Sequence, residues 1–192
     1  MRSVHWMVIV ALVVAAFLLG HALAQEQGGM QMPPWMQKGE QHKALAESVG
    51  EFDVAGEMWF APGGPPQPYK ATAKRELVLE GHYLKETFSG AWQGKPYTGW
   101  LFSGYDTFRK RYFNVWMDSM SPVASISFGG PDENGALVFD GEEPHPMTGK
   151  LTKSRSRVEY GENGKVTLSM YWVLPDGTEQ IHARLVYARK TG

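Results

Sequence analysis

Two charged residues on separate predicted strands are the candidates for polar chemistry. Asp118 follows Tyr112, Asn114 and Trp116 at every second position, so these four side chains share one face of a strand. A carboxylate on an inward face needs a partner, because burying an unpaired charge is costly. Arg155 would supply that partner from another strand and could orient the polar group of a ligand. An enzyme with a polar site around Asp118 and Arg155 is therefore one hypothesis.

A structural interpretation of the same two residues stands beside it. Asp118 ends its predicted strand, where it would cap the turn over residues 119–122, and Arg155 would lie exposed beside Lys153 and Arg157. Rows of charge on strands usually face water, which favours this interpretation. No catalytic residue and no metal ligand are predicted.

Aromatic side chains are the second group of candidates. The chain has seven Trp, and large aromatic rings line hydrophobic cavities as readily as they fill ordinary cores. The sequence leaves both roles open. The residues selected as candidates for ligand binding are Trp100, Tyr105, Trp116, Asp118 and Arg155.

Known catalytic and cofactor motifs are missing from the chain. It has no H-E-x-x-H, no G-x-S-x-G, no phosphate-binding G-x-x-x-x-G-K-[ST] and no dinucleotide-binding G-x-G-x-x-G opening a helix. No cofactor is expected, with haem as a minor alternative because a histidine could serve as its axial ligand. His182 is the residue tested for that role. It alternates with Ile181 and Ala183, so an inward apolar face would turn His182 to solvent.

Composition excludes several classes of protein. Among 192 residues there are 19 Lys and Arg against 20 Asp and Glu, a balance without the basic excess of a nucleic-acid-binding surface. The absence of Cys excludes disulfides, thiolate metal sites and thiol catalysis. Hydrophobic residues make up 43% of the chain, which favours a folded domain over disorder.

The first residues have the pattern of an export signal. Arg2 precedes the apolar run 6–19, and Ala22-Leu23-Ala24 has the small residues of a signal-peptidase site. We expect residues 1–24 to be removed and the protein to be periplasmic or secreted, with no membrane contact afterwards. An uncleaved membrane anchor is the alternative, because the run is only slightly shorter than the ~20 residues that span a bilayer. No pattern indicates an oligomeric state.

The remaining chain divides into a linker, a helix and a series of strands. Residues 25–37 are rich in Gly, Pro, Gln and Met, which predicts a flexible linker before a domain over 38–192. A helix is predicted over 38–49, with Leu45 and Val49 on one face. From Phe52 onward apolar residues alternate with polar ones, and short turns separate about ten strands. This pattern predicts a single up-and-down antiparallel β-barrel, all-β apart from that one short helix, since closure removes exposed edges.

Several stretches resemble the domain of unknown function 1579 family of bacterial proteins. They occur in the family's order and cover roughly residues 39–190. The matching stretches are EQHKAL at 40–45, GEFDV at 50–54, GYD at 104–106, Tyr112 with WMDSM at 116–120, PMTGK at 146–150 and PDG at 175–177. Arg155 also stands where the family has Arg. Phe52 departs from the family's usual Trp and lacks the indole N–H. The resemblance implies a lipocalin-like barrel and no assigned activity.

Three functions follow as hypotheses. The first is an exported barrel that binds a small apolar or amphipathic molecule in its interior, which is the partner we expect. The second is a structural or interaction domain whose interior is filled by side chains. The third is the enzyme with a site around Asp118 and Arg155. A cavity of several hundred Å³ would favour the first over the second.

Overall fold

A computed structural model describes residues 32–61 and 63–191 of the protein. The chain divides into two units, residues 1–37 and 38–192. The predicted signal peptide, residues 1–24, and residues 25–31 of the predicted linker lie outside the described residues. In the first unit, residues 34–36 form a short 3-10 helix, η1 (Pro34–Met36), and the Gln37 side-chain amide donates a 2.8 Å hydrogen bond to the Met32 carbonyl.

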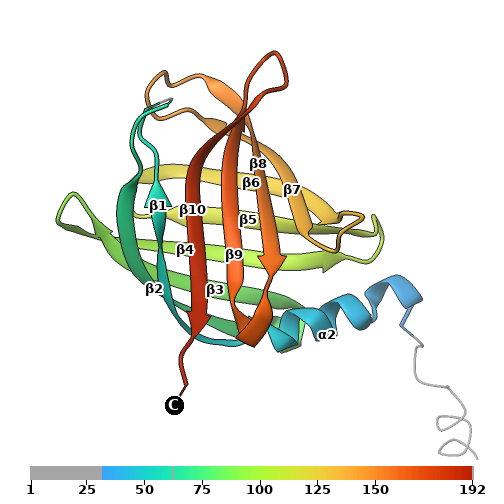
Figure 1. Ribbon diagram of the computed structural model, residues 1–192. Coiled ribbons are helices and arrows are strands. Elements are labelled where there is room, and N and C mark those ends of the chain that lie inside the picture. Colours follow the sequence, from blue (N-terminus) through green and yellow to red (C-terminus); the bar gives the residue numbers. More distant parts are fainter. Residues whose placement is uncertain (1–31, 62, 192) are drawn as a thin grey trace, which may run out of the picture. The chain divides into compact units, whose positions relative to one another are not determined.

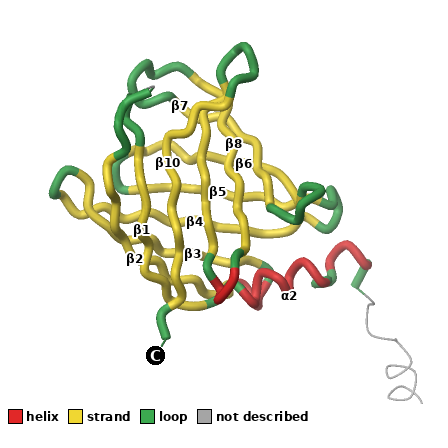
Figure 2. Tube along the Cα trace, viewed as in Figure 1, coloured by secondary structure: helices red, strands yellow, loops and turns green. Residues whose placement is uncertain are grey.

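The second unit is a closed antiparallel barrel of ten strands (Figures 1 and 2). Each strand pairs with the strands before and after it in sequence, and the first strand pairs with the last. The predicted up-and-down barrel is therefore confirmed. Its strands are β1 (Gly50–Met58), β2 (Gln67–Val78), β3 (Tyr83–Trp92), β4 (Lys95–Asp106), β5 (Arg111–Asp118), β6 (Ser121–Pro131), β7 (Leu137–Pro144), β8 (Leu151–Tyr160), β9 (Val166–Val173) and β10 (Glu179–Arg189).

Two of the connections contain short 3-10 helices with a residue in the left-handed region. These are η2 (Leu79–Gly81), where Glu80 has φ 58°, and η3 (Glu162–Gly164), where Asn163 has φ 56°. The second coincides with the Asn-Gly pair, a dipeptide that tolerates this backbone conformation in tight turns. Local turn chemistry therefore sets the hairpins that bring consecutive strands together.

The α-helix α2 (Glu40–Glu47) lies at the end of the barrel from which the C-terminus leaves (Figure 1). Two of its side chains are buried, Leu45 and His42, and the His42 ring lies 6.3 Å from that of Tyr105. At the other end of the helix, the Arg189 guanidinium donates to the carbonyls of Glu47 and Val49. These hydrogen bonds attach the C-terminal end of α2, which precedes β1, to the last strand, β10.

The packed core fills the half of the barrel nearest α2. Its buried residues come from the two ends of the domain as well as from the middle. They are Phe52, Val54, Ala73, Phe88, Val166, Leu185 and Tyr187. Phe52 is 1% exposed and packs edge-on against Tyr187, so it fills the interior position expected of its aromatic side chain. These packed residues close the interior of the barrel toward the end nearest α2.

Candidate functional site

A cavity of about 390 Å³ lies inside the barrel. Phe88, Val166 and Leu185 belong to the packed core and also line the cavity, so the core closes one end of it. The strand directions place Asp118, at the end of β5, and His182, near the start of β10, toward the end opposite α2. From there the cavity extends to Arg75, Glu86 and Tyr187, beside the packed core.

Aromatic rings form much of the cavity wall. The Phe88 ring lies 6.0 Å from Trp116 and 6.2 Å from Tyr97, in edge-to-face arrangements. The Trp116 indole also covers the backbone of Gly99 on the neighbouring strand. A Cβ atom at Gly99 would lie 2.2 Å from the indole, so only glycine leaves room for the ring there. The candidate Trp116 is thus a wall of the cavity.

Asp118 lines the same cavity and also caps the turn after β5. Its Oδ1 accepts hydrogen bonds from the backbone N–H groups of Met120 at 2.9 Å and Ser121 at 3.2 Å. Its Oδ2 accepts from the Trp116 indole N–H at 3.0 Å and from the Tyr97 hydroxyl at 3.3 Å. Both interpretations of Asp118 from the sequence therefore describe part of its position. Burial, followed by the negative charge of Asp118, raises the pKa of Tyr97.

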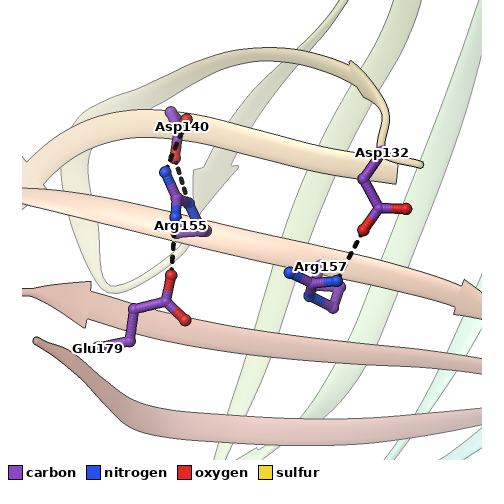
Figure 3. A network of polar contacts seen from close by, with 5 residues as sticks. All are labelled: Asp132, Asp140, Arg155, Arg157 and Glu179. Atoms are coloured by element: carbon purple, nitrogen blue, oxygen red, sulfur yellow. Dashed lines mark hydrogen bonds and ion pairs between the residues drawn. The ribbon is translucent and has the colours of Figure 1, made fainter. Parts of the chain in front are cut away.

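Arg155 does not partner Asp118. Its Nε and Nη2 donate to the two carboxylate oxygens of Asp140 at 2.7 and 3.2 Å, and its Nη1 donates to Glu179 at 2.8 Å (Figure 3). These hydrogen bonds raise the pKa of Arg155. Next along β8, Arg157 pairs with Asp132 at 2.8 Å. Arg155 borders the cavity, but its guanidinium is committed to two other carboxylates.

Trp100 and Tyr105 lie away from the cavity lining. Trp100 is 47% exposed, and the Lys85 ammonium sits over its ring at 4.8 Å, so it belongs to the outer wall. Tyr105 packs against Tyr112 at 4.9 Å, near the helix end of the barrel. Of the five candidates, the structure places Trp116, Asp118 and Arg155 at the cavity and leaves Trp100 and Tyr105 outside its lining.

Glu143 is a cavity-lining carboxyl that was not selected from the sequence. The Ser125 hydroxyl donates to its Oε2 at 3.1 Å. Burial raises the pKa of Glu143, and the charge of Asp118 raises it further, against the opposing effect of the Ser125 and Ser154 hydroxyls. No ion pair joins Glu143 to any residue within 32–61 and 63–191. Strand parity with the buried Phe139, four residues earlier, was the signal that could have found it.

His182 lines the cavity, so the prediction that it faces solvent was wrong. The pairing of β10 with β9 shifts between Ile181 and Ala183, and His182 is the additional residue of that bulge. A bulge interrupts the alternation of faces, which is why strict parity failed at this position. The imidazole stacks on Trp172 at 4.4 Å, and its Nε2 is buried without a hydrogen-bond partner among the described residues. Burial and the nearby His145 lower the pKa of His182 to about 4.

A buried ion pair also borders the cavity. Arg75 donates from Nε to Glu86 Oε2 at 2.6 Å, and the Tyr187 hydroxyl donates to Glu86 Oε1 at 3.3 Å. The side chain of Glu86 is only 2% exposed. This pair was missed because charged strand residues were expected to face water. The alternation could have found it, since Arg75 shares parity with the buried Ala73 and Glu86 with the buried Leu84.

The part of the chain that the structure describes shows neither a membrane-spanning helix nor a cluster of metal ligands. None of the helices there is both long and apolar enough to cross a membrane. No group of three or more His, Asp or Glu side chains in the described part of the chain could hold a metal ion. With its aromatic wall and a few polar side chains in its lining, the cavity can enclose an apolar body and present polar groups to it.

Comparison with known proteins identifies the family and assigns no activity. No curated protein was found to match the chain. A family model described as a protein of unknown function, DUF1579, matches residues 37–189, which include the helix and all ten strands of the barrel. The resemblance noted from short motifs is therefore confirmed over the whole domain, and the chain belongs to the DUF1579 family.

Proposed function

We propose that this DUF1579 barrel binds a small, mainly apolar molecule in its interior. The observation that supports the proposal is the cavity of about 390 Å³ inside the barrel. Ligand sites in proteins are typically ~300–1,000 Å³, mostly apolar, with a few placed polar groups. Phe88, Trp116 and Leu185 provide the apolar surface here, and Asp118 and Glu143 provide polar groups.

Two alternatives receive less support. A purely structural barrel would be expected to fill its interior with side chains, whereas this one leaves a cavity beside its packed core. The enzyme hypothesis required Asp118 and Arg155 to act together, whereas Arg155 bonds to Asp140 and Glu179. Ligand binding makes use of the cavity and does not require Asp118 and Arg155 to act together.

Binding is tested with N-phenyl-1-naphthylamine, a neutral dye whose fluorescence rises in apolar surroundings. The wild-type protein should bind the dye, and Ala183→Phe should abolish binding, because Ala183 is 2% exposed and lines the cavity. Ala188→Phe is the matched control, since Ala188 is exposed on the same strand. Circular dichroism would verify folding, and Ser156→Phe fills the cavity from β8 should Ala183→Phe fail to fold.

The outcomes are distinct. If the dye signal is lost in Ala183→Phe and Ser156→Phe but kept in Ala188→Phe, the result supports binding inside the barrel. Equal binding by wild type and Ala183→Phe would place the dye elsewhere and count against the proposal. Native mass spectrometry of protein purified from its own source provides a second measurement, in which a retained small molecule is expected. Absence of both dye binding and a retained molecule would overturn the proposal.

We also propose that the protein is exported, on the sequence pattern of residues 1–24. The intact mass of protein from the periplasmic or secreted fraction should correspond to a chain that begins at Gln25. A mass that includes residues 1–24 in the membrane fraction would support the uncleaved anchor instead.

A further inference from the structure

The charges around the cavity are unbalanced. Two basic side chains border it, and each is paired with carboxylates: Arg75 with Glu86, and Arg155 with Asp140 and Glu179. Asp118, Glu142 and Glu143 also line it, and none of the three forms an ion pair with a residue within 32–61 or 63–191. Glu142 is exposed, so Asp118 and Glu143 are the two of these carboxyl groups that are partly buried. The interior therefore presents carboxyl groups without a cation of the protein to match them.

The two carboxyl groups differ in what they have left to bind. A carboxylate has about four acceptor sites, and Asp118 uses its oxygens for the Tyr97 hydroxyl, the Trp116 indole and two backbone N–H groups. Asp118 therefore has no acceptor site left for a ligand. Glu143 accepts from the hydroxyls of Ser125 and Ser154, which leaves part of the acceptor capacity of its two oxygens free. Glu143 is the group that can accept from a ligand.

The neighbouring side chains suit a cation. Trp116 and Tyr97 line the same region and are held by their bonds to Asp118. Faces of such rings attract ammonium groups. His182 adds a separate observation, because its Nε2 is a buried polar atom without a partner. Its lowered pKa keeps the imidazole uncharged at neutral pH, so it does not repel a cation and offers one acceptor nitrogen.

Burial without a cation is unfavourable for Glu143, as its raised pKa reflects. A bound cation would remove that penalty by pairing with the carboxylate. An anionic ligand would add a third negative charge beside Asp118 and Glu143, and like charges in a partly desolvated site repel strongly. A neutral alcohol would gain a hydrogen bond but no ion pair. Electrostatics therefore rank an amine first among ligands of equal apolar size.

We propose that the ligand is an amphipathic amine whose apolar body lies against Phe88 and Leu185 and whose ammonium group pairs with Glu143. This inference rests on the proposed binding function and specifies the class of ligand. Each hydrogen of the ammonium is a donor, which complements the acceptor atoms that Glu143 and His182 present to the cavity.

The test compares decylamine, decan-1-ol and sodium decanoate as competitors of N-phenyl-1-naphthylamine at pH 7, below their micelle concentrations. All three carry the same ten-carbon chain, so the head group alone differs. Decylamine should displace the dye at concentrations about tenfold lower than decanol, because one charge-assisted hydrogen bond adds about that factor in affinity. Decanoate should be the weakest competitor of the three. Glu143→Gln should weaken decylamine about tenfold and leave decanol within about twofold, because it removes the charge and little volume.

Glu51→Gln is the matched control, since Glu51 is an exposed glutamate of β1 outside the cavity lining, and it should change none of the three affinities. Circular dichroism verifies that both variants fold, and Glu143→Met provides a second uncharged side chain of similar length. Equal or better displacement by decanoate or decanol would overturn the amine inference while leaving binding intact. Unchanged decylamine affinity in Glu143→Gln would overturn the role of Glu143. Failure of the wild-type protein to bind the dye would count against the binding function itself.

Discussion

Arg75 and Glu86 form a 2.6 Å ion pair inside the barrel, between neighbouring strands β2 and β3. The Arg75 guanidinium lies 4.9 Å from the ring of Phe52 and 4.7 Å from that of Tyr187, so its charge is enclosed by aromatic faces. Burial and the adjacent Glu86 raise the pKa of Tyr187 well above its ordinary value, which keeps its hydroxyl a donor. The packed core thus contains a polar centre whose members depend on one another.

Arg75→Met should destabilise the protein by about 3–5 kcal/mol, because it leaves the Glu86 carboxylate buried without its cation. The double variant Arg75→Met, Glu86→Leu should recover most of that loss. Urea unfolding measures both. Lys74→Met, which removes an exposed pair with Glu76, serves as the control and should cost less than about 1 kcal/mol. Equal losses in the single and double variants would show that the pairing itself contributes little.

Gly99→Ala should displace the Trp116 indole and lower stability by about 1–3 kcal/mol, as overpacking in a core does. Gly130→Ala is the control, because a Cβ atom at Gly130 has no heavy atom within 4 Å. Both changes add one methyl group to a strand, so thermal unfolding of the two variants isolates the contact with the indole. Similar melting temperatures would mean that Trp116 moves aside without cost.

Asp118→Asn should lower stability by about 1–2 kcal/mol and change the tryptophan fluorescence, because an amide has one acceptor oxygen where Asp118 uses two. The turn and the Trp116 indole would then compete for that oxygen. Asp106→Asn provides a control, since Asp106 accepts from the backbone N–H groups of Phe108 and Arg109 in another turn. If the two variants gave the same fluorescence change, the bond to Trp116 would not be its source.

Acid should destabilise the fold through His182. The unfolded chain takes up this proton near pH 6.5, and the folded protein does so only near pH 4. Between these values the unfolded state binds more protons, so stability falls as the pH falls, by up to about 3 kcal/mol once the pH is below 4. The raised pKa of Glu143 acts in the opposite direction. Comparing His182→Phe with wild type from pH 7 to pH 4 cancels the shared groups.

As the pH falls, the free energy of unfolding of wild type should decrease more than that of His182→Phe, because only wild type has the buried imidazole. Parallel curves for the two proteins over the whole range would contradict the buried, uncharged imidazole. Each measurement is a urea unfolding curve at fixed ionic strength, so that screening of the exposed charges stays constant.

The sequence was sufficient for the barrel because its signals are local. Alternation along β10 correctly places Ala183, Leu185 and Tyr187 on the inner face, and turn dipeptides such as Asn163-Gly164 mark the hairpins. The bulge at His182 depends on how β10 pairs with β9, a relation between distant segments that no local pattern carries. The partners of Arg155 could not be found from the sequence for a similar reason, since Asp140 and Glu179 come from two other strands.

Whether the interior is hollow depends on side-chain volumes summed across all strands. Trp116 could be recognised as a wall residue only together with Gly99, which lies diagonal to it on β4 and leaves room for its ring, and a single strand does not reveal this contact. Glu143 could not be singled out from one strand either, because what distinguishes it is that no basic side chain of the described residues pairs with it. Parity predicts which way a side chain points, and packing decides whether space remains beyond it.

The pairing of β1 with β10 has a consequence for how the chain assembles. The other pairings within the barrel join neighbours along the chain, so those hairpins can form early and independently. The barrel can close only when the final strand is present, because β1 pairs on one side with β2 and on its other side with β10, near the C-terminus. A chain that ended before β10 would keep its hairpins but would leave β1 and β9 as exposed edge strands. The last strand therefore protects the molecule from edge-to-edge association.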